Sequence, residues 1–244
     1  MKKQHTPNKT NLEGVKEIAK LLYMAVEIKP NEIVPFIVNH PFIESTHVQI
    51  EGKGFDLLDI TKEENAKMAQ EMWFRRFDEA TSIHDITCHV SKPYRLTFLK
   101  YAKEYLSLAD FSSYLAESWV TSENGNNDVN CSLKEIVSWF RKADKKALMG
   151  EEDYEIYNNF PETFTVYRGV AVGRVKNGLS WTRNLKTAQW FANRWGKKGY
   201  IQKAEISKEN ALAYLNSRGE DEVVVDVFAI KNNIVRMEAE GDAE

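Results

Sequence analysis

One stretch constrains the fold more than any other part of the chain: Leu212 to Phe228, which reads LAYLNSRGEDEVVVDVF. A turn at 216–219 separates an aromatic-bearing segment from the valine run 223–225, which is typical of a strand. In an extended chain alternate side chains share a face, so Glu220 and Glu222 are expected to point the same way. Two carboxylates on one face of a strand repel each other, which predicts a raised pKa for at least one of them. Such a pair favours a site that binds a cationic group. The alternative interpretation is a solvated acidic hairpin.

Two segments upstream carry further polar side chains on predicted strands. The β-branched and aromatic run FTVYRGV contains Arg168 followed by Gly169. An arginine beside a glycine suits a phosphate, because the guanidinium and the backbone can both come close. The short run GLSWT places Ser180 and Thr182 on one face of a strand. The chain therefore presents, in order, Arg, Ser-x-Thr and Glu-x-Glu.

In this order and context the three motifs resemble those of mono-ADP-ribosyltransferases of the arginine-serine-glutamate class. That class includes cholera-type and binary-toxin enzymes and some phage enzymes, so the resemblance implies a bacterial or phage toxin or effector. It covers about residues 160–236. The central motif departs from the family's usual serine, threonine, serine, because Trp181 and Thr182 follow Ser180. Only 12 positions separate Arg168 from Ser180, which leaves room for little more than a turn.

The resemblance implies transfer of ADP-ribose from NAD, as co-substrate, to a macromolecule, with release of nicotinamide. Glu222 is then expected to stabilise an oxocarbenium-like transition state, and Ser180 to hold the Glu222 carboxylate by a hydrogen bond. Arg168 is expected to bind a phosphate of NAD or its nicotinamide ribose. For Trp181, a place in the core is the alternative to a contact with nicotinamide. The residues predicted to bind NAD are Arg168, Gly169, Ser180, Trp181 and Thr182.

The acceptor implied by the resemblance is a protein arginine, because in the family a glutamate two residues before the catalytic one goes with arginine. Glu220 holds that position here, and a carboxylate can orient a guanidinium and accept its proton. The residues predicted to bind the acceptor are Tyr214, Asn216, Arg218 and Glu220. Two alternatives stay open: a base of RNA or DNA as the acceptor, or a catalytically inactive copy of the fold that binds a partner. An antitoxin or other partner is not identified by the sequence.

Composition limits the other classes of function. The net charge of −3 disfavours a surface coated in basic patches for nucleic acid. Cys88 and Cys131 have no paired spacing, which indicates a reducing compartment rather than a disulfide framework. His84, Cys88 and His89 form the one sequence cluster with metal-ligand chemistry. Neighbouring residues on a strand point to opposite faces, so no metal site is predicted.

The sequence gives no sign of a membrane partner. No apolar run approaches about 18 residues, and the polar stretch 1–10 lacks the apolar core of a secretory signal. We therefore expect a cytoplasmic protein, acting in the host cytoplasm if it is encoded by a phage. Its expected partner is a macromolecular substrate, a cytoplasmic protein first and a nucleic acid second.

A domain boundary is predicted in the polar linker 124–130, because Gly and Asn punctuate it. A mainly helical region of unknown role, 1–125, precedes an ADP-ribosyltransferase-like domain, 131–237. The resemblance implies an α+β fold whose second domain contains two packed, steeply crossed β-sheets. Thr61 and Ser132 are predicted helix N-caps. Helices are predicted at 12–26, 61–80, 93–108, 111–120, 133–148, 151–159 and 185–195, and strands at 82–89, 164–170, 178–182, 199–206 and 222–230.

Overall fold

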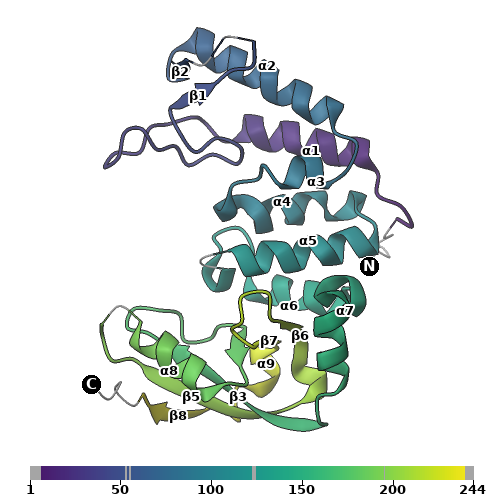
Figure 1. Cartoon of the computed structure of the whole chain (residues 1–244), viewed down its shortest axis with the longest axis vertical. Coiled ribbons are helices and arrows are strands. Elements are labelled where there is room, and N and C mark those ends of the chain that lie inside the picture. Colours follow the sequence, from purple (N-terminus) through teal and green to yellow (C-terminus); the bar gives the residue numbers. More distant parts are fainter. Residues whose placement is uncertain (1–6, 53, 55, 123–124, 195, 240–244) are drawn as a thin grey trace. The chain divides into compact units, whose positions relative to one another are not determined.

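The computed structural model describes residues 7–52, 54, 56–122, 125–194 and 196–239. The chain divides into two compact units, the first made of Met1–Tyr114 and Thr121–Glu123, the second of Leu115–Val120 and Asn124–Glu244. Figure 1 labels the elements of both. The second unit thus includes the later part of helix α5 (Leu108–Thr121), which the sequence places before the predicted linker.

The first unit is mainly helical and has an aromatic core. Its elements are α1 (Leu12–Ala25), β1 (His47–Gln49), β2 (Leu57–Asp59), α2 (Glu63–Glu79), α3 (His84–Thr87), α4 (Arg95–Ala102) and the 3-10 turns η1 (Lys92–Tyr94) and η2 (Lys103–Tyr105). The ring of Phe42 lies 4.8 Å from that of Phe77 and 6.5 Å from that of Phe98. Trp73 of α2 is also buried, as predicted for this aromatic helix. These rings therefore serve packing.

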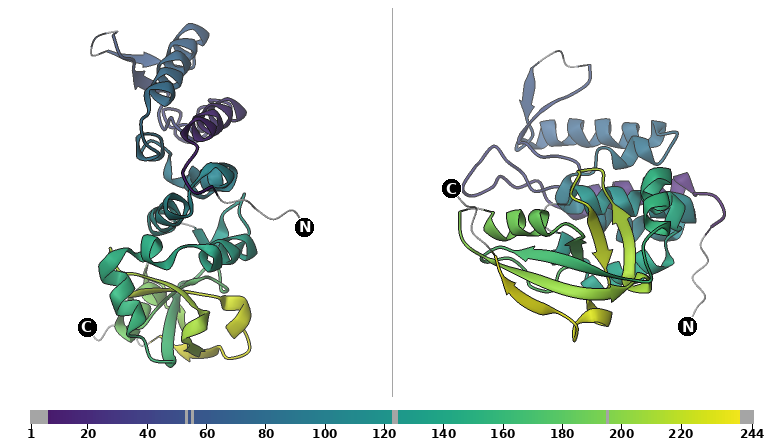
Figure 2. Two further views of the ribbon diagram at one scale, coloured as in Figure 1. Left: turned by 90° about the vertical axis from the view of Figure 1, so that its right-hand side faces the viewer. Right: turned by 60° about the horizontal axis from the view of Figure 1, so that its bottom comes forward.

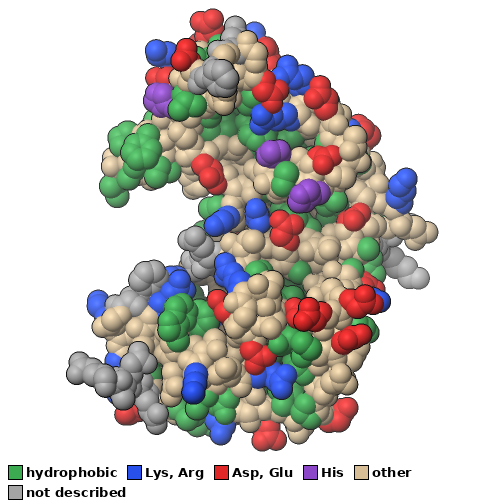
Figure 3. Space-filling model, in the orientation of Figure 1, with side chains coloured by type: hydrophobic (Ala, Val, Ile, Leu, Met, Phe, Trp, Pro, Cys, Tyr) green, Lys and Arg blue, Asp and Glu red, His purple; other side chains and the backbone are tan. Residues whose placement is uncertain are grey.

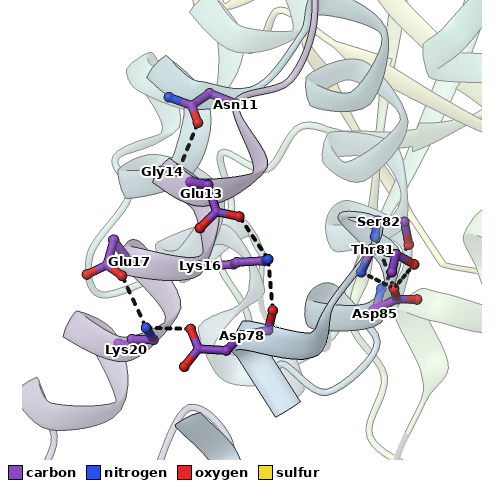
Figure 4. A network of polar contacts seen from close by, with 10 residues as sticks. All are labelled: Asn11, Glu13, Gly14, Lys16, Glu17, Lys20, Asp78, Thr81, Ser82 and Asp85. Carbon is purple, nitrogen blue, oxygen red and sulfur yellow. Dashed lines mark hydrogen bonds and ion pairs between the residues drawn. The ribbon is translucent and has the colours of Figure 1, made fainter. Parts of the chain in front are cut away.

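Lysine side chains join α1 to the end of α2 (Figure 4). Lys16 Nζ lies 2.9 Å from both Glu13 Oε1 and the backbone oxygen of Asp78. Lys20 Nζ lies 3.2 Å from Glu17 Oε1 and 2.7 Å from Asp78 Oδ1. Lys16 is buried, but its ammonium group keeps these hydrogen-bond partners. The partners offset the free energy that burying the charge would otherwise cost.

The segment 82–89 differs from the predicted strand, because it contains the short helix α3. Asp85 Oδ2 accepts hydrogen bonds from the backbone nitrogens of Thr81 and Ser82, at 2.8 and 3.0 Å. Ser82 Oγ in turn accepts from the backbone nitrogen of Asp85 at 3.3 Å. This reciprocal pair is the pattern of a capping box, and it turns the chain into a helix where composition alone suggested an extended segment.

The start of α2 also differs from the predicted capping box at Thr61. The Thr61 hydroxyl donates to Asp59 Oδ1 at 2.7 Å, and Lys62, the N-cap, provides no side-chain cap. The predicted helix 93–108 is interrupted after Ala102, where η2 begins. The first difference concerns only the helix cap, whereas the second divides a helix that the pattern predicts to be continuous.

Hydrophobic side chains gather on the loop between α1 and β1, as Figure 3 shows. Ile33, Phe36 and Ile37 in this loop are 89%, 63% and 43% exposed. Single exposed apolar side chains are ordinary, but three within five residues form a local apolar patch.

Among the described residues of the whole chain, no helix has both the length and the apolar character that crossing a bilayer requires.

The second unit combines helices with a six-stranded antiparallel sheet of order β6-β7-β4-β3-β5-β8. Besides the end of α5, its helices are α6 (Leu133–Lys142), α7 (Lys145–Asn158), α8 (Leu185–Asn193), α9 (Val227–Ile230) and the 3-10 turns η3 (Gly125–Asn127) and η4 (Lys208–Asn210). Its strands are β3 (Thr163–Val170), β4 (Ser180–Thr182), β5 (Tyr200–Ser207), β6 (Ala211–Leu215), β7 (Glu222–Val225) and β8 (Val235–Glu238).

The two sides of this sheet run in different directions. Strand β3 pairs with β5 along its whole length, but it meets β4 through one register pair, Tyr167 with Thr182. Figures 1 and 2 show β6 and β7 lying across the direction of β3 and β5. With the two-stranded sheet β1–β2 of the first unit, the described chain holds two antiparallel sheets. The predicted α+β class is confirmed.

The helices before the sheet are capped by side chains. Ser132 and Glu135 form the capping box of α6, so the predicted N-cap is confirmed. The predicted helix 133–148 is divided, because α6 ends at Lys142 and Asp144 caps the start of α7. Gly150, with φ of 72°, bends α7 near the point where a separate acidic helix was predicted to begin.

The strand predictions hold best in the middle of this unit. The expected strands 164–170 and 199–206 match β3 and β5 to within one residue at each end. The expected strand 222–230 stops at Val225, because Asp226 caps α9. Strands β6 and β8 were not predicted. Helix α8 ends at Asn193, and Trp195, its predicted last residue, lies outside the described residues.

Candidate active site

Strand β4 lies between β3 and β7, so the serine motif is next to both other motifs. Thr182 is paired with Glu222 on one side and with Tyr167, the neighbour of Arg168, on the other. Three segments that are far apart in the sequence therefore converge on one region of the sheet. The predicted order of motifs along the chain becomes an arrangement of three adjacent strands.

The partly buried carboxylate of Glu222 is at the centre of this region. Its Oε1 accepts a hydrogen bond from Trp119 Nε1 at 2.9 Å. Burial raises the pKa of Glu222 above its ordinary range, and the negative charge of Glu220 raises it further. Hydrogen bonds from Trp119 and Ser180 and the charge of Arg168 lower the pKa of Glu222, but less strongly. The raised pKa that the acidic pair predicts is therefore present, and burial is its main cause.

Arg168 is anchored by backbone carbonyls of the segment that leads into β4. Its Nη1 donates to the backbone oxygen of Ser180 at 2.6 Å, and its Nη2 to that of Val175 at 3.1 Å. Its Nε is buried and has no hydrogen-bond partner among the described residues. Burial lowers the pKa of Arg168 to about 10, against the attraction of Glu222. The guanidinium is thus cationic at neutral pH and fixed in place.

Two glycines allow this packing. A Cβ on Gly178 would lie 2.2 Å from Arg168 Nη2, so the guanidinium lies directly on the backbone there. A Cβ on Gly169 would lie 2.1 Å from the backbone oxygen of Ala188, so α8 crosses β3 in direct contact. The structure gives Gly169 a packing role, and its contact with NAD stays a prediction. Gly178 is a residue of this region that the sequence did not single out.

The other two residues of the serine motif are buried. Trp181 is 2% exposed, and its Nε1 donates to the backbone oxygen of Gly178 at 3.0 Å. This supports the core position considered for Trp181 rather than the predicted contact with NAD. Thr182 Oγ1 donates to the backbone oxygen of Glu220 at 2.9 Å and accepts from the backbone nitrogen of Asn184 at 3.1 Å. Thr182 therefore fixes the backbone next to the catalytic candidate.

The turn before Glu222 is held by its own side chains. Asn216 Oδ1 accepts from the backbone nitrogen of Asp221 at 2.9 Å, and the backbone nitrogen of Asn216 donates to Asp153 Oδ2 at 2.8 Å. Gly219 and Asp221 have φ of 68° and 51°, the left-handed conformation that such a tight turn requires. Arg218 is exposed at the tip. The predicted turn is present, and its role in binding an acceptor stays a prediction.

Tyr214 has a different place from the one predicted. It is 4% exposed on β6, and its ring packs edge-on against Phe160 at 5.4 Å. Burial, together with a hydrogen bond to Asp221, raises the pKa of Tyr214. A ring enclosed in this way packs in the core, so the predicted stacking face for an acceptor is not supported.

Two residues of the site lie before the predicted transferase domain and were missed. Trp119 of α5 donates to Glu222, as described above. Asn126 of η3 donates from Nδ2 to Ser180 Oγ at 3.3 Å and accepts at Oδ1 from the backbone nitrogen of Leu179 at 2.6 Å. The sequence interpretation placed Asn126 in a linker, where its polarity is equally typical. The first residue of that linker, Asn124, lies outside the described residues.

Comparisons with protein-family models, with curated proteins and with solved structures found no match for this chain. Among the described residues, no group of three or more His, Cys, Asp or Glu side chains is arranged to hold a metal ion. The function of the chain is therefore to be inferred from the contacts of Arg168, Ser180 and Glu222.

Proposed function

We propose that the chain is a mono-ADP-ribosyltransferase that moves ADP-ribose from NAD to an arginine side chain of a protein and releases nicotinamide. The observation that carries this proposal is the meeting of Arg168, Ser180 and Glu222 on adjacent strands. Ser180 accepts from the Arg168 guanidinium at its backbone oxygen, and its hydroxyl lowers the pKa of the Glu222 carboxylate. A solvated acidic hairpin would have no need of such contacts.

The layout of the sheet supports the same proposal. A transferase domain of this class is expected to have two packed, crossed sheets. Here β6 and β7 run across β3 and β5, and the single pair Tyr167 with Thr182 links β3 to β4. We propose that these two parts of the sheet correspond to the two expected layers.

Arg168 fits an anionic group of NAD. Its Nε is buried without a partner among the described residues, which leaves a donor for a phosphate or ribose oxygen. The carbonyls of Ser180 and Val175 hold the two ends of the guanidinium, so little freedom is lost when a ligand binds. A lysine could not keep both carbonyl contacts and present a third donor in the same plane.

Glu222 would act by its charge. NAD supplies a bond between ribose and nicotinamide whose cleavage places positive charge on the sugar, as in glycoside hydrolysis. An ionised carboxylate held beneath the sugar stabilises that charge as it develops. Nicotinamide leaves as a neutral base, so Glu222 need not donate a proton. Because the pKa of Glu222 is raised, we expect activity to fall as acidification protonates it.

Glu220 would serve the acceptor. Thr182 fixes the backbone oxygen of Glu220, and the Glu220 side chain is only partly buried. Its carboxylate is in a position to orient an incoming guanidinium and to take the proton that the guanidinium loses on bonding to the ribose carbon. This role favours an arginine acceptor over a nucleic-acid base.

The test is to incubate the purified protein with a cell lysate and NAD labelled in its adenylate phosphate, with Glu222→Gln as the control. We expect macromolecular label that protease removes and nuclease does not, and none with the control. Agmatine, which presents a guanidinium, should accept label, whereas cadaverine, an amine of similar length, should not. Loss of label to nuclease would move the acceptor to nucleic acid, and free ADP-ribose alone would indicate a glycohydrolase. A wild-type protein that releases no nicotinamide would leave a binding module and refute the proposal.

A further inference from the structure

The Glu222 carboxylate is held by a residue that lies 103 positions earlier in the sequence. Trp119 is 4% exposed, and its indole packs edge-on against Phe140, with ring centroids 5.6 Å apart. The ring is therefore enclosed and cannot easily turn away. Its N–H, the one polar group of an indole, points at Glu222 Oε1 at 2.9 Å.

A second contact reaches the same carboxylate through Ser180. Asn126 Nδ2 donates to Ser180 Oγ, and the Ser180 hydroxyl is one of the groups that lower the pKa of Glu222. The orientation of the Asn126 amide is fixed by its Oδ1, which accepts from the backbone nitrogen of Leu179. The reverse orientation would set two donors against each other. Asn126 thus fixes Ser180, whose hydroxyl favours the charged form of Glu222.

We infer that Trp119 and Asn126 are positioning residues of the transferase site, Trp119 by fixing Glu222 Oε1 directly and Asn126 by fixing the Ser180 hydroxyl. This inference rests on the proposed function. It places the later part of α5 and η3 within the catalytic unit, whereas the polar linker led to a predicted domain that begins at residue 131. A purely structural role, in which the indole only fills space beside Phe140, is the competing explanation.

Electrostatics give the two explanations different consequences. Burial raises the pKa of Glu222, and the hydrogen bond from Trp119 is the largest influence that lowers it. Removing the indole N–H while keeping an aromatic ring should therefore raise the pKa of Glu222 further. Lost packing alone would change the unfolding temperature but would leave that pKa where it is.

The experiment compares Trp119→Phe with Trp139→Phe, which alters another buried tryptophan of the same unit, in the full chain. Two properties are measured: nicotinamide release against pH, and titration of the glutamate carboxyl carbons by NMR in the absence of NAD. For Trp119→Phe we expect the acid limb of kcat/KM to move to higher pH, with about a tenfold loss on that limb, the effect of a lost hydrogen bond to a charged group. Trp139→Phe should leave the limb in place, and Asn126→Ala should move it in the same direction by less.

A Trp119→Phe protein with the wild-type acid limb and the wild-type carboxyl titration would overturn the inference. If that variant fails to fold, benzothienylalanine at position 119 keeps the shape of the indole and replaces its N–H with sulfur, and the same two outcomes decide. If the wild-type protein releases no nicotinamide, the proposed function fails. The NMR titration then still shows whether Trp119 and Asn126 hold the Glu222 carboxylate.

Discussion

Two carboxylates, one in each unit, show how differently the same group is used. Asp85 at the start of α3 accepts from the backbone nitrogens of Thr81 and Ser82 and from the Thr81 hydroxyl (Figure 4). These hydrogen bonds lower the pKa of Asp85 to about 2. Glu222 also accepts hydrogen bonds, but burial exceeds them and raises its pKa.

We interpret the difference as that between a structural carboxylate and the proposed catalytic one. Asp85 is charged because its surroundings stabilise the charge, so its ionisation favours the fold. The ionised form of Glu222, in contrast, destabilises the fold. This is expected where a bound substrate, and not a group of the protein, is to stabilise the charge. Changes at the two residues should therefore have opposite effects on activity and on stability.

The largest expected effect is on catalysis by Glu222→Gln. The variant keeps the shape of the side chain and an oxygen for the Trp119 N–H, but it removes the charge. Loss of one preorganised electrostatic contact of this kind lowers turnover by about a hundredfold or more. Asp85→Asn, the matched change in the first unit, should keep nicotinamide release within about twofold of wild type because structural surface changes rarely alter chemistry. Equal losses in the two variants would remove the distinction between the carboxylates.

The second prediction separates transfer of ADP-ribose to the acceptor from cleavage of NAD, through a change at Glu220. Glu220→Gln should lower labelling of agmatine by about a hundredfold, the lower end of the usual contribution of a general base, while hydrolysis of NAD continues. Because the charge of Glu220 raises the pKa of Glu222, the acid limb of NAD hydrolysis should also move to lower pH. That direction is opposite to the one expected for Trp119→Phe. A Glu220→Gln variant that labels agmatine at the wild-type rate would refute the acceptor role.

A smaller effect concerns stability. The raised pKa of Glu222 already includes the attraction of Arg168, so its net environment disfavours the charge. Glu222→Gln should raise the free energy of unfolding at pH 7 by about 1 kcal/mol. As the pH falls through the raised pKa of Glu222, the wild-type carboxylate takes up a proton in the folded state. The gain in the free energy of unfolding should then shrink, and it should vanish at pH values below 4.5, the ordinary pKa of a glutamate. Urea unfolding at several pH values measures this, and a destabilised variant at pH 7 contradicts it.

Local patterns in the sequence predicted the parts of the fold that local forces decide. The alternating, β-branched character of 164–170 predicted β3, and Ser132 with Glu135 predicted the start of α6. Where two local forces compete, the sequence misleads. The contacts between Asp85 and Ser82 form a helix in a segment whose composition suits a strand as well.

The site could be predicted only in part for a different reason. Arg168, Ser180 and Glu222 were proposed because the order of their motifs resembles that of a transferase class, and the strands that carry them are neighbours in the sheet. Trp119 and Asn126 reach the same place through tertiary packing, which leaves no local signal. A tryptophan in an apolar helix suggests core packing, and an asparagine in a polar stretch suggests a linker, so their composition conceals their contacts.

Burial explains why the aromatic residues of the site were assigned less well. Strand β6 is buried at every position, so Tyr214 has no exposed face to offer an acceptor. Trp181 lies on the central strand β4 and is enclosed on that side of the sheet. Alternation predicts which residues share a face, but whether a face is covered depends on helices that come from elsewhere in the chain.

The smallest expected effect is that of Asp85 on the stability of the first unit. Asp85 has a lowered pKa, so its ionisation contributes stability that is present above the ordinary value of 3.8 and is lost as the pH falls through about 2. Asp85→Asn keeps an oxygen for the backbone nitrogens of Thr81 and Ser82 but removes the charge. We expect the unfolding temperature at neutral pH to fall by about 3 °C, and the difference from wild type to disappear between about pH 4 and pH 2. Asp85→Ala, which removes the acceptor as well, should cost more at both ends of this range. Calorimetry across the range measures both variants, and a loss for Asp85→Asn that persists at pH 2 would assign the effect to geometry instead of charge.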